Sequence, residues 1–184
     1  MTEIKAIETV YDNHKFRSRL EARWAVFFKT LGVKYEYEKE GYEINGCYYL
    51  PDFFLPEIPL WVEAKGEGPT YLEILLLSML ADNTKNRGTI VGGIRNYLEE
   101  DVYSGDWERY HTAFLDEDIS DAPYFFCECR YCGAIGFEWS GYGSRINCCT
   151  RNKEVGDYAT SQSPRLVEAY RTAIQARFEH GEKG

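Results

Sequence analysis

The chain has 184 residues, 44% of them hydrophobic and 16% aromatic, which excludes a disordered protein and suffices for one core with a small appended module. Its formal net charge of −9 argues against an extended positively charged surface that binds nucleic acid. Arginines and bound divalent cations can still make the potential inside a cleft positive. No apolar run reaches the length of a membrane span, and residues 1–15 lack the apolar stretch of a signal peptide. We therefore expect a cytoplasmic protein without a membrane partner.

The first half of the chain carries alternating helix and strand signals. Apolar residues recur at steps of three and four over residues 16–32, which predicts a helix that Gly32 can end. The dipeptide Asn45-Gly46 is a strong hairpin signal between two strand-like segments. The predicted elements, in chain order, are a helix over 16–32, strands over 33–44, 47–56 and 58–67, a helix over 70–84, a strand over 87–95 and a C-terminal helix over 163–181.

This order predicts an α/β protein with a central mixed β-sheet flanked by helices, because a helix-linked strand joins a sheet that begins as a hairpin. Ser163 and Pro164 suit the cap and the first position of the last helix. We expect a core over 1–122, a small cysteine-rich module over 123–152, and a C-terminal loop and helix over 153–184 that packs on the core.

The segment YLPDFFLPEIPLWVEAKGE, residues 49–67, is apolar enough for a core yet carries Asp52, Glu63 and Lys65. Strand side chains alternate, so Glu63 and Lys65 share one face, and the preceding strand can bring Asp52 beside Glu63. Two adjacent carboxylates repel each other, and a divalent cation such as Mg²⁺ or Mn²⁺ removes the conflict. With a lysine beside it, such a site suits hydrolysis of a phosphodiester bond.

The helix before these strands contributes further candidates. Glu21 lies beside the apolar stripe of the helix over 16–32, where its carboxylate can face the same site. Arg17, Arg19 and Arg23 supply positive charge for phosphate contacts with nucleic acid. Taken singly, the same residues have simpler explanations: an ion pair between Glu63 and Lys65 on a sheet, and a solvated Glu21 paired with Arg17.

Pro51-Asp52, ten intervening residues, and Glu63-Ala64-Lys65 resemble the signature of the PD-(D/E)xK, or restriction-endonuclease-like, nuclease superfamily. Over residues 11–95, and again at 176–182, the chain is similar to small nuclease-like proteins of bacteriophages and actinobacteria. The resemblance implies that Asp52, Glu63 and the backbone carbonyl of Ala64 bind Mg²⁺ or Mn²⁺ as cofactor. It further implies that Lys65 is the catalytic lysine and that Glu21 is an auxiliary ligand or positions the water.

Two functions follow from this resemblance. The first is metal-dependent hydrolysis of DNA, in the host cytoplasm if the chain is phage-encoded, with the choice between endonuclease and exonuclease open. The second is a non-catalytic DNA- or protein-binding module on a nuclease-like fold, because such families contain inactive members. The acidic charge favours the second function, and the complete set of Asp52, Glu63 and Lys65 favours the first.

Five of the six cysteines lie between residues 127 and 149. Cys129-x-x-Cys132-Gly133 has the spacing of a zinc knuckle, and the segment after it can form a hairpin that returns Cys148 and Cys149 to the same place. The cluster resembles a zinc ribbon with a structural Zn²⁺ on these four cysteines. Adjacent cysteines bind one ion awkwardly, so Cys127 is a substitute for Cys149. An iron–sulfur cluster and free thiols in a core are the alternatives.

Overall fold

The computed structural model describes residues 7–94, 111–113, 119–120, 124–139, 146, 148–149 and 159–178. Its largest sheet is mixed, as predicted, because β7 pairs in parallel with β8 while the other neighbours are antiparallel. The order across this sheet is β10 (Ile119–Ser120), β9 (His111–Ala113), β8 (Arg87–Val91), β7 (Leu60–Ala64), β6 (Phe53–Leu55) and β3 (Glu36–Tyr37).

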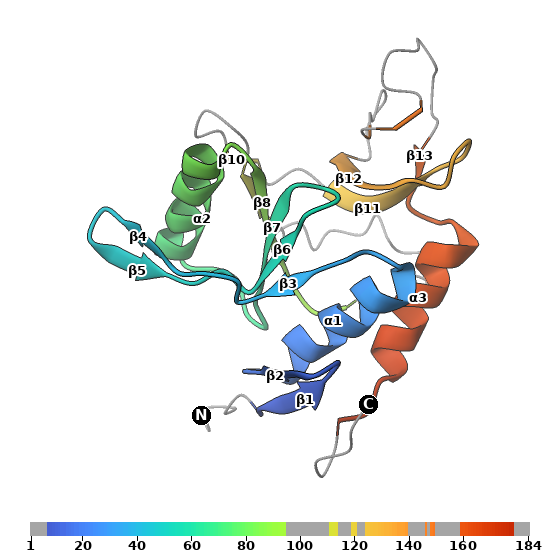
Figure 1. Cartoon of the computed structure of the whole chain (residues 1–184), viewed down its shortest axis with the longest axis horizontal. Coiled ribbons are helices and arrows are strands. Elements are labelled where there is room, and N and C mark those ends of the chain that lie inside the picture. The colour runs from blue at the N-terminus through green and yellow to red at the C-terminus, as the bar shows by residue number, and fades with distance from the viewer. Residues whose placement is uncertain are drawn as a thin grey trace.

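Helices cover both faces of this sheet (Figure 1). On one face, α1 (Arg19–Leu31) packs against α3 (Pro164–Gln175), and their core includes the β7 residues Val62 and Ala64. On the other face, α2 (Tyr71–Thr84) encloses a second apolar cluster that includes Trp61 of β7. Successive residues of β7 therefore serve opposite layers, and all five residues of this strand are buried.

The ends of the helices follow from their caps. Ser18 accepts a hydrogen bond from the Glu21 N–H, so α1 starts at Arg19 and not at Phe16, which belongs to a strand. Gly32 ends α1 in the left-handed conformation, as predicted. Thr70 caps α2 and Ser163 caps α3, but α3 ends at Gln175, six residues before the expected end at Gly181.

Two predicted strands are each divided in the structure. Segment 33–44 forms β3 in the large sheet and then β4 (Tyr42–Ile44), while segment 47–56 forms β5 (Cys47–Tyr49) and then β6. The predicted hairpin turn is present, with Asn45 and Gly46 both at positive φ, and β4 packs against α2 rather than in the sheet. The pattern of alternation cannot show this change of sheet, because both halves remain extended.

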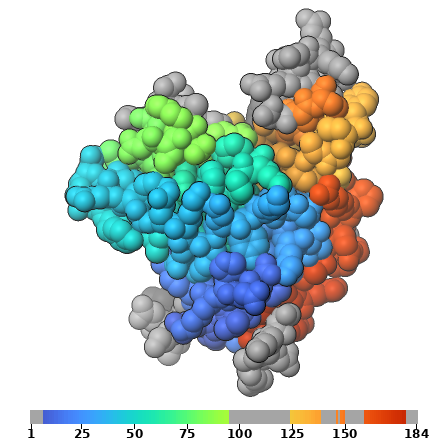
Figure 2. All heavy atoms as spheres, in the orientation of Figure 1, coloured from blue at the N-terminus to red at the C-terminus, as the bar shows by residue number. Residues whose placement is uncertain are grey.

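A hairpin and a small separate sheet surround this frame. The strands β1 (Thr9–Tyr11) and β2 (His14–Phe16) form a hairpin beside α1. The strands β11 (Tyr124–Cys129), β12 (Ile135–Trp139) and β13 (Ala159–Thr160) form a separate sheet. Figure 2 shows this sheet, in yellow and orange, lying directly against the red α3.

The cysteine-bearing hairpin shares the main core of the protein. Phe126 of β11 and Phe137 of β12 are 1% and 3% exposed, and the Phe126 ring lies against those of Trp24, Phe27 and Phe28 in α1. The expected boundaries near 122 and 152 fall outside the described residues. No helix in the described part of the chain is long and apolar enough to cross a membrane.

Candidate active site and cysteine centre

The ladder between β6 and β7 brings Asp52 and Glu63 together. Phe53 pairs with Val62, so the next step of the same register sets Asp52 opposite Glu63. The Asp52 N–H lies 3.4 Å from Glu63 Oε2, and the Ala64 N–H donates to Asp52 Oδ2 at 2.8 Å. Both acids are buried, at 2% and 4% exposure, which is costly for carboxylates without partners.

The paired residues of β6 and β7 end at Phe53 and Val62, and the chain bends at Asp52. Pro51, directly before the bend, has no N–H and cannot donate a ladder hydrogen bond. The Pro-Asp pair therefore lies where the antiparallel ladder ends.

Lys65 lies on the same face as Glu63, as alternation predicts. Its Nζ is 2.9 Å from Glu63 Oε1 and 2.8 Å from Glu73 Oε1. Burial disfavours the charged amine, but the two carboxylates outweigh burial and raise the pKa of Lys65 above its ordinary value. Glu73 was not predicted for the site. The pattern Thr70-x-x-Glu73 indicates a helix start in the sequence but does not indicate a contact between Glu73 and Lys65.

Glu21 is held by neutral donors at the N-terminus of α1. It is 6% exposed and accepts hydrogen bonds from the Arg17 N–H, the Ser18 hydroxyl and the Tyr37 hydroxyl. The simpler explanation, a solvated Glu21 paired with the Arg17 side chain, is wrong. The Arg17 guanidinium instead contacts Asp52 Oδ1 and Glu38 Oε1, each at 2.7 Å.

Burial and the neighbouring acids change the pKa of Asp52. Burial raises the pKa of Asp52 to about 8, and the charges of Glu63 and Glu21 add to the rise. The Ala64 N–H and the Arg17 guanidinium oppose it without cancelling it. Burial and Glu63 also raise the pKa of Tyr49, whose hydroxyl donates to Glu63 Oε2 at 3.2 Å. Such a cluster of negative charge favours a cation.

The other predicted arginines lie apart from these contacts. Arg19 and Arg23 are half-buried on α1, and the Nε of each is buried without a hydrogen-bond partner among the described residues. Neither forms an ion pair with Asp52 or Glu63 in this part of the chain. Their role in phosphate binding stays a prediction.

Carboxylate oxygens are the ligands that Mg²⁺ and Mn²⁺ prefer, and Mg²⁺ commonly uses one or two protein carboxylates. Asp52, Glu63 and the Ala64 carbonyl therefore suit such an ion chemically. Every oxygen of the two carboxylates already accepts a hydrogen bond or an ion pair, but each oxygen has a second lone pair. Binding would loosen the contacts of Arg17 and Lys65.

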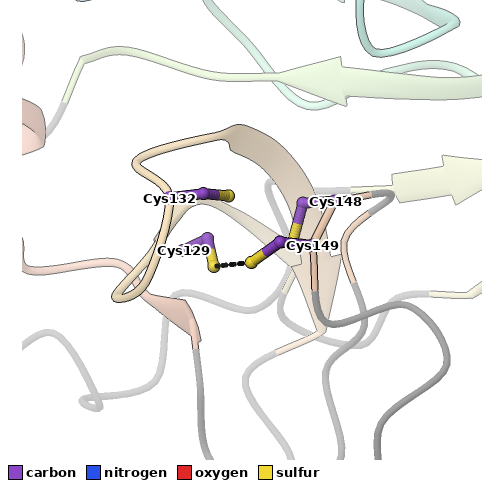
Figure 3. Close-up of side chains that lie close together, drawn as sticks. All are labelled: Cys129, Cys132, Cys148 and Cys149. Carbon is purple, nitrogen blue, oxygen red and sulfur yellow. Dashed lines mark hydrogen bonds between the residues drawn. The ribbon is translucent and has the colours of Figure 1, made fainter.

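A second centre lies on the β11–β12 hairpin, where four cysteines converge (Figure 3). Their sulfur atoms lie within 4.8 Å of one another, and the sulfurs of Cys129 and Cys149 are 3.9 Å apart. The turn between the strands is closed by the hydrogen bond from the Gly133 N–H to Cys129 O, with Gly133 at positive φ. Among the described residues, these cysteines are the one group of three or more side chains gathered closely enough to hold a metal ion.

Cys127 is not part of this group. Its Sγ faces the Gly136 carbonyl at 3.8 Å, and burial raises its pKa to about 12, which keeps it a protonated thiol. Backbone N–H groups of Ala134 and Cys149 instead lower the pKa of the Cys132 thiol to about 6. The four gathered cysteines are Cys129, Cys132, Cys148 and Cys149, the set predicted from spacing.

Arg165 connects this centre to the helices. Its guanidinium donates to the carbonyl of Gly133 in the cysteine turn and to the carbonyl of Leu31 at the end of α1. It also contacts Glu128 Oε1 at 3.3 Å. A residue at the start of α3 therefore joins the turn to the helix that carries Glu21. The sequence did not indicate this connection, since Arg165 lies 32 residues from Gly133 and 134 residues from Leu31 along the chain.

Comparisons of the chain with protein-family models, with curated proteins and with solved structures returned no match.

Proposed function

We propose that this protein is a divalent-metal-dependent nuclease that hydrolyses DNA phosphodiester bonds on a restriction-endonuclease-like core. The observation that carries the proposal is the buried pair of Asp52 and Glu63, with Lys65 on the same face at the end of β7. The pair of Glu63 with Lys65 does not by itself require a second buried acid beside it. Asp52 is such an acid, and burial together with the charges of Glu63 and Glu21 raises its pKa even though Arg17 contacts it.

In this proposal, Asp52, Glu63 and the Ala64 carbonyl hold Mg²⁺ or Mn²⁺. The ion would supply Lewis-acid stabilisation of charge on the phosphate and a bound water of lowered pKa. Lys65, kept protonated by two carboxylates, stabilises negative charge that develops on a phosphate oxygen. Glu21, fixed by Tyr37 and Ser18, orients the water, and Arg17 contacts a neighbouring phosphate.

We infer that the four cysteines hold a structural Zn²⁺. Four thiolates in a closed set are typical of structural zinc sites, whereas a catalytic site keeps one position open. The hairpin that carries them packs Phe126 and Phe137 into the main core, which supports a role in stability rather than in chemistry.

A specific observation favours the second candidate, a non-catalytic binding module. Arg17 and Lys65 already neutralise Asp52 and Glu63 at salt-bridge distances, so the acids have partners without any ion. In a binding module, these four side chains would form a permanent polar network. Such a network would bind no divalent cation at Asp52 and Glu63.

The test is a cleavage assay on labelled single-stranded, double-stranded and branched DNA and on RNA, with Mg²⁺, Mn²⁺ or EDTA. Lys65→Ala should lose cleavage, while Lys34→Ala, which removes an exposed lysine paired with Glu57, should retain it. Metal-dependent cleavage of DNA by the wild-type protein, together with its absence in Lys65→Ala, supports the nuclease function. Cleavage of RNA alone would contradict DNA as the substrate, and binding without cleavage would favour the binding module.

A further inference from the structure

Glu73 is an acid of the site that the sequence signature does not contain. It is the third residue of α2, and its Oε1 lies 2.8 Å from Lys65 Nζ, as close as Glu63 is on the other side at 2.9 Å. The ammonium of Lys65 therefore lies between one acid of the proposed metal pair and one acid of a helix.

The position of Glu73 is fixed by a capping box. Its Oε2 accepts hydrogen bonds from the Thr70 N–H at 2.7 Å and the Thr70 hydroxyl at 2.9 Å, while Thr70 in turn caps the Glu73 N–H. One oxygen is thus committed to the helix cap and the other to Lys65. The helix start holds the lysine at a set place.

The α1 helix repeats this arrangement. Ser18-x-x-Glu21 starts α1 as Thr70-x-x-Glu73 starts α2, and in both helices a Ser or Thr side chain caps the N–H of the glutamate. Both glutamates extend from the first turn of their helix toward the acids of the sheet, one held by the Arg17 N–H and the other paired with Lys65. Each helix therefore contributes one fixed carboxylate to the surroundings of Asp52 and Glu63.

We propose that Glu73 is a positioning residue that anchors Lys65 when Glu63 binds the divalent cation. An ion on Glu63 competes with the ammonium for the same carboxylate, and Lys65 keeps its place because Glu73 remains. This inference rests on the proposed nuclease function.

Three substitutions separate this role from the stability of the helix. Glu73→Gln keeps an oxygen for the Thr70 donors, and glutamine is accepted in a capping box, but it loses the charge that pairs with Lys65. Thr70→Ala removes the hydroxyl of the cap but keeps the Thr70 N–H that binds Glu73 Oε2 and the charge of Glu73 that pairs with Lys65. Glu67→Gln is the matched control, since it removes an exposed acid that has no ion pair among the described residues.

The first readout is single-turnover cleavage with saturating Mg²⁺. Glu73→Gln should slow the chemical step about tenfold, the scale expected for a lost charge-assisted hydrogen bond, with an unchanged unfolding temperature. Thr70→Ala should lower the unfolding temperature and slow the chemical step less than Glu73→Gln does, because the carboxylate that pairs with Lys65 remains. In a Lys65→Ala background, which lacks cleavage, Glu73→Gln should leave the affinity for Mn²⁺ unchanged, because its target is already gone.

The second readout does not need cleavage. In calorimetric titration of the zinc-loaded protein with Mn²⁺, Glu73→Gln should weaken binding at the site about threefold, since Lys65 then pairs with Glu63 alone. Wild-type protein that binds Mn²⁺ and cleaves DNA, with Glu73→Gln no different from Glu67→Gln, would overturn this inference alone. Wild-type protein with neither binding nor cleavage would overturn the proposed function and this inference with it.

Discussion

The two candidate centres differ in where their counter-charges come from. At the acidic site, the chain supplies them itself: Arg17 lies on Asp52 and Lys65 on Glu63. At the cysteine centre, four sulfurs lie within 4.8 Å of one another, and two of the thiols have strongly shifted pKa values in opposite directions. Each acid of the first centre therefore has a cationic partner in the chain, whereas the four thiols of the second centre could hold a metal ion.

Substitutions in these two centres should have different effects on the stability of the fold. Removing a ligand from the cysteine centre should destabilise the fold, because the hairpin that carries it contributes Phe126 and Phe137 to the main core. Removing an acid from the site should abolish chemistry and relieve repulsion between buried charges. The same kind of substitution therefore has opposite effects on stability in the two regions.

The largest effect is expected at the cysteine centre. Cys132→Ser should lose the bound zinc and lower the free energy of unfolding by about 3 kcal/mol or more, since a structural zinc contributes its binding free energy to folding. Metal analysis and denaturant unfolding measure the two quantities. Cys47→Ser, which alters an exposed cysteine outside the cluster, is the control and should change neither. Equal stability of both variants would exclude a structural metal.

The next effect is expected at Asp52. Asp52→Asn should abolish Mn²⁺ binding at the site and lower the cleavage rate at least about a thousandfold, because it removes a ligand of the proposed ion. It should also raise the free energy of unfolding in EDTA by about 1 kcal/mol, because the repulsion with Glu63 and Glu21 disappears. A less stable variant would show that Asp52 has a mainly structural role.

The pH dependence of stability should follow from the same residue. The folded pKa of Asp52, about 8, lies above the ordinary value of 3.8, so the folded state holds this proton over a range where the unfolded state has released it. The stabilisation is complete below the unfolded value and is lost as the pH rises through the folded one. Unfolding in EDTA should therefore become easier from about pH 4 to about pH 8, with a flatter profile for Asp52→Asn. Identical slopes would contradict the shift.

The smallest effect is expected at Arg165, which connects the cysteine turn to the end of α1. Arg165→Gln loses the hydrogen bonds to the carbonyls of Gly133 and Leu31 and should lower the free energy of unfolding by about 1–2 kcal/mol. Zinc content should stay unchanged, since no ligand is altered. Arg171→Gln, which removes an arginine paired with Glu168 on the same helix, is the control and should have little effect. Loss of zinc from Arg165→Gln would place this arginine in the metal centre itself.

The sequence predicts those features that depend on neighbours along the chain. Apolar periodicity and Gly32 locate α1 and its end, and Ser163 and Pro164 locate the start of α3. The Asn45-Gly46 turn locates a hairpin, and alternation sets Glu63 and Lys65 on one face. The spacing of the cysteines likewise identifies the four that converge.

The features that the sequence does not indicate depend on contacts between distant segments. The pair of Lys65 with Glu73 depends on how α2 starts against the sheet, and the contact of Arg17 with Asp52 depends on how α1 crosses it. The division of segments 33–44 and 47–56 between two sheets depends on packing of the hairpin against α2. None of these has a periodic or local signature.

The most direct test of the central claim is Mg²⁺-initiated cleavage of labelled DNA by wild-type protein and by Glu63→Gln, followed side by side. Glutamine keeps the shape of the side chain and removes the carboxylate that both Lys65 and the proposed ion require. We predict cleavage by the wild-type protein that starts only on addition of Mg²⁺ and that Glu63→Gln lacks. Equal cleavage by both proteins would contradict the proposed site, and no cleavage by either would contradict the nuclease.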